Sequence, residues 1–389
     1  MRIAYFTDTL APEINGVTNT LSYLTGYLQR MGIEFQVFAP DYSDTAVEDQ
    51  DPRVLRFKGF RPYVNPSSRL AFPAHGQVLS ALEAFRPDLV HIVSELGIGY
   101  AGLRAARQLK LPLVMSYHTN FDQYLRYYDF PQLEKLYWKY MAWFHSFPAR
   151  NLCPSTDTMR QLEARGFPQL ELWSRGVDLS IFSPSRRSEE LRRSLGGGED
   201  RVLFLYAGRL SREKGLDTLA KAIRVFHGWY GDRAGFVFAG DGPYMEHMNG
   251  LELPNAVFTG FQSKERLAEL YASCDALVFP SGTETFGNVV LEAMASALPV
   301  LCVDAGGITD FTSHLDNAYV CGNGHIMGMA KGMSLLLSSP ALRDSLARGG
   351  LETARRRSWD GVFHSLMEQY AAVCAETAPA LLAGGRKSA

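Results

Sequence analysis

The stretch that decides the fold is Pro280–Val300, PSGTETFGNVVLEAMASALPV. An apolar run, Ala276–Phe279, precedes it, and a polar turn with glycines, Ser281–Gly287, follows Pro280. Apolar residues then recur at helical spacing: Val289, Val290, Ala293, Met294 and Ala297. The pattern predicts a buried strand, a turn and a helix N-terminus, where backbone amides and the helix dipole favour an anion such as a phosphate.

Two carboxylates accompany this predicted anion site. Glu284 lies in the turn and Glu292 in the helix. A carboxylate repels phosphate but accepts hydrogen bonds from sugar hydroxyls. Backbone amides that bind phosphate, together with carboxylates that accept hydrogen bonds from hydroxyls, indicate a site for a sugar nucleotide. The alternative is an ordinary strand-turn-helix unit with solvated acids.

The same stretch resembles the signature of the retaining glycosyltransferases of family 4. Glu284 and Glu292 are separated by seven residues, with Phe286-Gly287 between them and Ala293-Met294-Ala295 after them. The resemblance covers nearly the whole chain. It implies an α/β fold of the GT-B type, with two facing Rossmann-like domains, a cleft between them and a C-terminal helix crossing back.

Length and composition agree with a globular protein of two domains. The chain has 389 residues, of which 46% are hydrophobic and 21% charged, enough for two full cores. The net charge of −2 argues against a nucleic-acid partner. The five cysteines are scattered, so we expect buried free thiols in a cytoplasmic protein. We expect no signal peptide and no membrane span.

The N-terminus opens as a Rossmann-type unit without a dinucleotide fingerprint. Arg2–Thr7 reads as a strand, a loop follows, and Val17–Met31 is helix-like. The resemblance implies that Asn15-Gly16 faces the donor diphosphate, and a simple turn glycine is the alternative. We assign Asp8 and Asn15 to acceptor binding and Gly16 to the nucleotide sugar.

His118 directly follows an apolar strand, Leu111–Tyr117. Ligands of open α/β sheets bind at the carboxyl ends of strands, and a histidine can donate a hydrogen bond there. The resemblance implies that His118 contacts the donor sugar, and a structural histidine is the alternative.

Two segments of the N-terminal half raise the question of membrane contact. The first is basic and aromatic: Arg53, Arg56, Lys58, Phe60, Arg61, Tyr63, Arg69 and Phe72. The second, Pro131–Phe147, is an aromatic helix-like segment for which core packing is the default. The alternatives are peripheral contact at the inner membrane face or contact with an anionic acceptor.

Arg209 and Lys214 lie in a loop between a predicted strand, Arg201–Ala207, and a predicted helix, Leu216–Trp229. Both are cations suited to phosphate oxygens, and they would stabilise a departing nucleoside diphosphate. Their arrangement also matches the family.

The resemblance implies further contacts to the nucleotide sugar. Asp241-Gly242 belongs to a turn that flanks the nucleotide, and Phe261 follows a strand where the base packs. With Gly16 and Glu292, the predicted nucleotide-sugar residues are Asp241, Gly242, Phe261, Thr285, Phe286, Gly287 and Asn288.

The predicted domains are 1–174 for the acceptor and 201–358 for the donor, with a linker at 175–200 and a returning helix at 359–376. Glycines and charges in the linker mark the boundary. We expect residues 377–389 to be frayed.

The predicted function is hexosyl transfer from a GDP- or UDP-linked sugar, with mannose favoured, to a lipid or glycan. His118, Arg209, Lys214 and Glu284 are the predicted catalytic residues, and we expect neither a cofactor nor a metal. The resemblance also implies retention of configuration. A UDP-sugar enzyme making glucosyl or sulfoquinovosyl diacylglycerol, a phosphorylase or epimerase, and a non-catalytic sugar-nucleotide-binding subunit are the alternatives.

Overall fold

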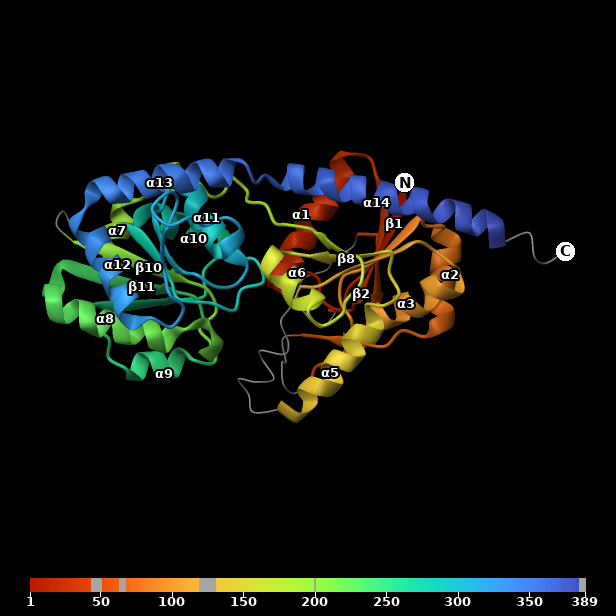
Figure 1. Cartoon of the computed structure of the whole chain (residues 1–389), viewed down its shortest axis with the longest axis horizontal. Coiled ribbons are helices and arrows are strands. Elements are labelled where there is room, and N and C mark those ends of the chain that lie inside the picture. The colour runs from red at the N-terminus through yellow and green to blue at the C-terminus, as the bar shows by residue number, and fades with distance from the viewer. Residues whose placement is uncertain (43–50, 63–67, 119–130, 199–200, 385–389) are drawn as a thin grey trace. The chain divides into compact units, whose positions relative to one another are not determined.

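The computed structural model describes residues 1–42, 51–62, 68–118, 131–198 and 201–384 (Figure 1). The chain divides into two units. Of the described residues, 1–118, 132–174 and 359–384 belong to the first unit, and 131, 175–198 and 201–358 belong to the second.

The first unit is built on a sheet of seven strands in the order β3-β2-β1-β6-β7-β8-β9, all paired in parallel. The strands are β1 (Arg2–Phe6), β2 (Glu34–Pro40), β3 (Val54–Phe57), β6 (Leu89–Ile92), β7 (Leu113–Ser116), β8 (Arg150–Cys153) and β9 (Leu170–Leu172). A separate antiparallel ribbon joins β4 (Gly59–Phe60) and β5 (Leu70–Ala71). The strand order reverses between β1 and β6, which makes this edge the switch point of a doubly wound sheet.

Alternating side chains of β1 supply the cores on both faces of this sheet. Ile3 and Tyr5 pack with α1 and α14, whereas Ala4 and Phe6 pack with α2 and α3. Figure 1 shows these helix pairs on opposite faces. The helices are α1 (Gly16–Arg30), α2 (His75–Phe85), α3 (Gly97–Gln108), α5 (Pro131–Phe144), α6 (Thr156–Glu163) and α14 (Trp359–Gly384).

The second unit repeats the scheme with six parallel strands in the order β12-β11-β10-β13-β14-β15. This is the Rossmann order, and its switch point lies between β10 and β13. The strands are β10 (Val202–Ala207), β11 (Ala234–Ala239), β12 (Ala256–Gly260), β13 (Ala276–Phe279), β14 (Val300–Val303) and β15 (Tyr319–Cys321).

Helices cover both faces of the second sheet as well. Leu203 and Leu205 pack in the core that contains α10 and α11, and Phe204 packs in the core that contains α8 and α12. The helices are α7 (Glu189–Ser194), α8 (Leu216–Tyr230), α9 (Met245–Gly250), α10 (Lys264–Ser273), α11 (Asn288–Ala295), α12 (Ile326–Ser338) and α13 (Pro340–Arg355), with short 3-10 turns η1 (Pro184–Arg186), η2 (Arg212–Lys214), η3 (Gly231–Arg233) and η4 (Gly307–Asp310). The α/β class predicted from the sequence is confirmed.

The described part of the segment predicted as a linker (175–200), residues 175–198, belongs to the second unit. It contains η1 and α7, which pack against α10, and Leu191 joins the core. The Arg192 Nη1 atom lies 2.8 Å from Asp275 Oδ2 and ties the segment to the sheet. At the other end of the chain, α14 continues to Gly384, beyond the predicted end of the returning helix at residue 376, and the fraying expected from residue 377 stays a prediction.

Candidate active site

Lys214 and Glu284 meet at the switch point of the second sheet. Lys214 ends η2, in the loop after β10, and Glu284 lies in the loop after β13. The Lys214 Nζ atom is 2.6 Å from Glu284 Oε1, and the Ser281 hydroxyl donates to the same oxygen at 2.9 Å. The two side chains are 17% and 20% exposed, so a ligand at the strand ends can reach both charges.

Arg209 supplies a second cation beside this pair. Arg209 lies in the loop after β10, and its backbone carbonyl oxygen accepts a 2.9 Å hydrogen bond from the Tyr206 hydroxyl. This bond fixes the backbone and leaves the side chain exposed. Within the described part of the chain, the guanidinium makes no hydrogen bond or ion pair. Such a cation is suited to an incoming anion.

The turn before α11 requires a glycine and presents its backbone. Gly287 precedes the helix with φ 99°, and a Cβ atom there would lie 2.2 Å from Ile308 Cγ2. Phe286 is buried and packs on Phe311 with ring centroids 5.1 Å apart, so only its backbone is available to a ligand. Thr285 and Asn288 remain half-buried.

Two helices that begin beside the Lys214–Glu284 pair, α8 and α11, lack a capping side chain among the described residues, as α9 and α12 do elsewhere at this edge. Asn15 caps α1 and Ser263 caps α10. No side chain among the described residues caps the first amides of α8 or α11. Asn288, the first residue of α11, also has a buried Oδ1 atom that no described residue pairs. The unpaired polar groups and the helix dipoles favour an anionic, hydrogen-bonding ligand.

Glu292 lies one helical turn after Asn288 and on the same face of α11. The Tyr271 hydroxyl donates to Glu292 Oε2 at 3.2 Å. Burial raises the pKa of Glu292 to about 7, and the Tyr271 hydrogen bond opposes that rise. Burial makes the charged form of Glu292 costly, so additional hydroxyl donors would stabilise this carboxylate.

The loops after β10, β11 and β12 interlock at the same edge. Gly240 packs so closely that a Cβ atom would lie 1.9 Å from Gly208 O, and Leu210 N donates to Asp241 O at 2.9 Å. The Asp241 carboxylate is exposed and accepts a hydrogen bond from Gly242 N, and Phe261 is 63% exposed after β12. The structure therefore brings the predicted residues of the second unit to one edge.

Asp8 has a structural task that the sequence did not reveal. It follows β1, is buried, and accepts hydrogen bonds from the Ser94 hydroxyl at 2.8 Å and from Ile98 N at 2.8 Å. Leu96 N donates to the same carboxylate at 3.1 Å. Burial raises the pKa of Asp8, and these hydrogen bonds oppose the rise. Asp8 thus fills the anion position at the N-terminus of α3.

The side chain of Asn15 is likewise occupied by hydrogen bonds within the first unit. Its Oδ1 atom accepts hydrogen bonds from Val17 N and Thr18 N, both at 2.9 Å, and its Nδ2 atom donates to Thr9 Oγ1 at 2.9 Å. Gly16 starts α1 and is exposed. The acceptor roles predicted for Asp8 and Asn15 stay predictions, and both side chains have structural explanations.

His118 follows β7 at the carboxyl edge of the first sheet. Its Nε2 atom lies 2.7 Å from the Ser116 hydroxyl, and its ring meets Trp173 edge-on at 5.5 Å. His118 is half-buried. It belongs to the first unit, whereas the cations and carboxylates belong to the second.

Sequence reasoning missed several partners of these residues. Tyr271 and Ser281 bind the two glutamates, and Ser94 binds Asp8. Glu213 was also missed: it is buried beside Lys214, pairs with the Ser211 hydroxyl at 2.5 Å, and has a second oxygen without a described partner. Acidity next to Lys214 was the only sequence signal for Glu213.

The basic segment is less available than its sequence suggests. Arg53 pairs with Asp51 at 2.7 Å, Arg56 donates to Pro40 O at 3.0 Å, and Arg69 is buried. Lys58, Phe60, Arg61 and Phe72 are exposed; Tyr63 lies outside the described residues. Membrane contact through this segment stays a prediction.

The aromatic helix α5 is partly explained by packing. Met141 and Phe144 are buried in the first unit, whereas Leu136 and Trp143 are exposed. None of the helices in the described ranges has the length and apolarity needed to cross a bilayer. The same ranges contain no cluster of three or more metal-binding side chains.

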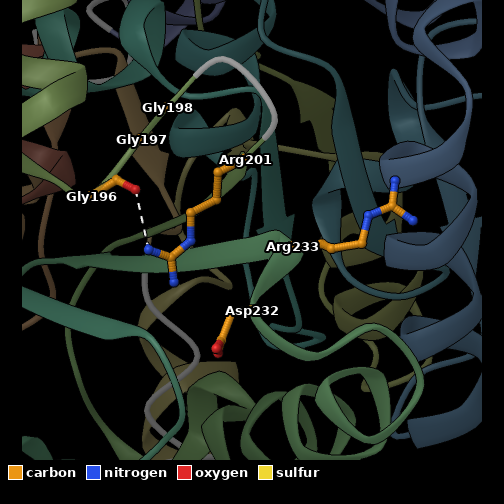
Figure 2. A pocket seen from close by; sticks show the side chains of 6 residues that line it. All are labelled: Gly196, Gly197, Gly198, Arg201, Asp232 and Arg233. Atoms are coloured by element: carbon orange, nitrogen blue, oxygen red, sulfur yellow. Dashed lines mark hydrogen bonds between the residues drawn. The ribbon is translucent and has the colours of Figure 1, made fainter.

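A separate hollow lies at the opposite edge of the second sheet (Figure 2). Arg201 precedes β10, and Asp232 and Arg233 precede β11, so this hollow is at the amino ends of the strands. Arg201 donates to Gly196 O at 3.2 Å, and Figure 2 shows Arg233 pointing away. Doubly wound sheets bind ligands at the carboxyl ends, which favours the Lys214–Glu284 edge as the active site.

Comparison with known proteins agrees with this geometry. A family model described as Glycosyltransferase Family 4 matches residues 14–181, and one described as Glycosyl transferases group 1 matches residues 187–353. The GDP-mannose-dependent alpha-mannosyltransferase of Mycobacterium tuberculosis (strain CDC 1551 / Oshkosh) is 36% identical over 80% of this chain and 81% of that protein. The sulfoquinovosyl transferase of Arabidopsis thaliana is 31% identical over 95% of this chain and 74% of that protein.

A solved structure extends the comparison to the fold. Sucrose-phosphate synthase from Thermosynechococcus elongatus superposes with a TM-score of 0.76, over 96% of this chain and 99% of that chain, at 19% identity. The GT-B class is thereby confirmed. With these matches over both halves of the sequence, the chain belongs to the glycosyltransferases of family 4.

Proposed function

We propose that this glycosyltransferase moves a hexose, with mannose favoured, from a nucleoside diphosphate sugar to a lipid or glycan acceptor, with retention of configuration. The observation that carries the proposal is the Lys214–Glu284 pair at the switch point of the second sheet. It places a cation for phosphate and a carboxylate for sugar hydroxyls side by side. The similarity to a relative named for GDP-mannose supports mannose.

The donor is assigned to the second unit for a physical reason. In the first unit, Asp8 already fills the anion position at the N-terminus of α3. In the second unit, α8 and α11 begin without a capping side chain. A diphosphate bound in the second unit would be attracted by helix dipoles and cations. A diphosphate at the N-terminus of α3 in the first unit would be repelled by the buried Asp8 carboxylate.

The residue roles follow from this placement. Arg209 and Lys214 hold the diphosphate and stabilise the charge of the departing group, while Glu292 accepts from the ribose hydroxyls. Glu284 and the backbone of Thr285–Gly287 hold the sugar, and His118 contacts the sugar from the first unit. The acceptor attacks from the face of the leaving group, and a donor phosphate oxygen takes the acceptor proton. Arg209 and Lys214 stabilise the negative charge of the departing diphosphate, so the proposal includes no metal and no cofactor.

Thermal stabilisation by nucleotides tests the donor assignment. A ligand that binds only the folded protein raises the melting temperature. We expect shifts with GDP and GDP-mannose, unchanged by a chelator. Transfer to a mannose acceptor then tests turnover; binding without turnover would indicate a non-catalytic binding protein. Loss of activity in chelator would overturn the metal-free mechanism.

A UDP-sugar donor is the second candidate. The 31% identity with a sulfoquinovosyl transferase over 95% of the chain favours it. Base recognition after β12 would use backbone and the exposed Phe261, neither of which distinguishes guanine from uracil. A shift with UDP and one UDP-sugar, and none with GDP, would establish this candidate.

A further inference from the structure

Glu95 lies at the switch point of the first sheet, in the loop between β6 and α3. Its Oε1 atom lies 3.3 Å from His145 Nε2, and its backbone carbonyl oxygen accepts a hydrogen bond from the Tyr140 hydroxyl. Its Oε2 atom makes no hydrogen bond or ion pair with the part of the chain that the structure describes, and it is not enclosed by that part. The side chain is 15% exposed, so the protein holds one carboxyl oxygen and leaves the other available to a ligand.

The hydrogen bonds of Asn151 decide which nitrogen of His145 carries a proton. Asn151 Nδ2 donates to His145 O and to Pro168 O, both at 2.8 Å, and backbone carbonyl oxygens can only accept. The Asn151 amide therefore has a single orientation, in which its Oδ1 atom faces His145 Nδ1 at 2.7 Å. Because an amide oxygen also can only accept, His145 must donate from Nδ1.

The second nitrogen of His145 then requires a proton of its own. With only Nδ1 protonated, the lone pair of Nε2 would face the Glu95 carboxylate, and His145 is too deeply buried, at 1% exposed, for water to relieve that repulsion. A proton on Nε2 converts the repulsion into an ion pair. His145 directly follows α5, and its backbone N–H donates to Met141 O, so the C-terminal end of the helix dipole also favours a cation there.

We propose that Glu95 binds a hydroxyl group of the acceptor substrate through Oε2, and that the His145 imidazolium is the positioning residue that holds Glu95. Ligands of doubly wound sheets bind outside the carboxyl ends of the strands at the switch point, where Glu95 lies. A carboxylate accepts hydrogen bonds from hydroxyls and repels anions, so the bound group is an uncharged polyol, a sugar or a glycerol. That this polyol is the acceptor rests on the proposed function, whereas its binding requires only the first unit.

The surroundings of Glu95 support a polyol. Asp8, at the same switch point, is buried and uses its oxygens in hydrogen bonds within the first unit, whereas Glu95 keeps one oxygen accessible. Tyr100 and Trp143 are 46% and 44% exposed, and their rings lie 6.4 Å apart. Trp143 also meets the ring of Tyr140, which binds the backbone of Glu95. Exposed aromatic rings next to the Glu95 loop suit the C–H face of a sugar, and the carboxylate suits its hydroxyl edge.

Ring-nitrogen NMR of the full chain labelled with 15N-histidine tests the ion pair without any ligand. His145 is assigned through nuclear Overhauser contacts with Phe167, whose ring centroid lies 5.2 Å away. At pH 7 we expect protons on both Nδ1 and Nε2. In Glu95→Gln we expect the Nε2 proton to be lost and the Nδ1 proton to remain, because Asn151 still accepts from Nδ1. A wild-type ring with a single proton would overturn the proposal.

Titration with two soluble polyols tests the binding role. Methyl α-mannoside represents a glycan acceptor, and dihexanoylglycerol represents a lipid acceptor, so the polyol that binds identifies the source of the hydroxyl. We expect at least one of them to shift the ring N–H signals of His145. Its affinity, followed on the Nδ1–H signal, should fall about tenfold in Glu95→Gln, because a hydrogen bond to a charged group is lost. Glu83→Gln, which removes an exposed carboxylate from α2, is the matched control and should bind as the wild type does.

The outcomes separate this proposal from the proposed function. No shift with either polyol at about 100 mM, or equal affinities in wild type and Glu95→Gln, would overturn the binding role. If Glu95→Gln fails to fold, the wild-type spectra and titrations decide. These experiments use no nucleotide, so a failure of nucleotide sugars to bind would overturn only the proposed function. In transfer assays with the polyol that binds, Glu95→Gln should raise the acceptor KM about tenfold and leave the donor Kd unchanged.

Discussion

Lys214 and Glu284 form a 2.6 Å ion pair across the reversal of strand order in the second sheet. Each charge satisfies the other, so neither is left uncompensated in a half-buried position. A nucleoside diphosphate sugar offers better partners to both, because its phosphates attract the lysine and its hydroxyls donate to the glutamate. In the proposed function, the donor therefore replaces the contact between Lys214 and Glu284 with contacts of its own.

Removing Lys214 should separate activity from stability. In Lys214→Ala we expect activity to fall at least about tenfold, because the departing diphosphate loses a cation. The free energy of unfolding should fall by about 1–3 kcal/mol, since Glu284 loses the partner of its largely buried charge, but the fold should survive. Steady-state transfer rates and urea unfolding measure the two effects. Arg212→Ala, which removes an exposed cation from the same turn, is the matched control. Wild-type kinetics in Lys214→Ala would contradict the assignment.

Arg209 should matter for catalysis and not for folding. Its guanidinium is exposed, while the loop is held through its carbonyl oxygen by Tyr206. Arg209→Ala should therefore leave the melting temperature of the empty protein unchanged and lower kcat by about a hundredfold. Arg209→Lys keeps the charge without the planar fork and should recover part of the loss. Equal kcat in all three proteins would place Arg209 outside the site.

The fold class and the edge of the second sheet were predictable because their signals are local. Apolar runs that end in glycine-containing turns mark strand ends, and Glu284, Lys214 and Arg209 lie in those turns. The task of Asp8 was not predictable, because its hydrogen bonds go to α3, which is distant in sequence. The hydrogen bonds that join His91 to Tyr370 and to Ser116 depend on long-range packing in the same way.

Replacing Asp8 tests whether its buried carboxylate stabilises the fold or binds the acceptor. Asp8→Asn places an amide N–H₂ against the donors from α3, so we expect a loss of about 1–3 kcal/mol in the free energy of unfolding. Donor affinity should stay at the wild-type value, because the second unit is untouched. Chemical denaturation and nucleotide titration measure these quantities. A rise in acceptor KM without loss of stability would instead confirm the acceptor role.

Glu292 should make both stability and donor binding depend on pH. Because its pKa in the folded protein is raised to about 7 from 4.5, the folded state holds the proton more tightly than the unfolded state. Stability is therefore lost as pH rises from about 4.5 to about 7, and the full penalty persists above that range. Glu292→Gln removes this penalty, so the empty variant should be more stable than wild type at pH 8 by roughly 1–3 kcal/mol, and nearly equal at pH 4.5.

The affinity for the donor should rise with pH, whereas the free energy of unfolding falls. Ribose hydroxyls donate to the ionised carboxylate, so the affinity of wild type for the nucleotide sugar should weaken as pH falls below about 7. The diphosphate of a nucleotide sugar keeps its charge over this range, so the change reports on the protein. Calorimetric titration from pH 5.5 to 8.5 measures it, with Glu246→Gln, an exposed acid on α9, as control. Glu292→Gln should bind more weakly and without this pH dependence, and the same slope in both proteins would remove Glu292 from the ribose site.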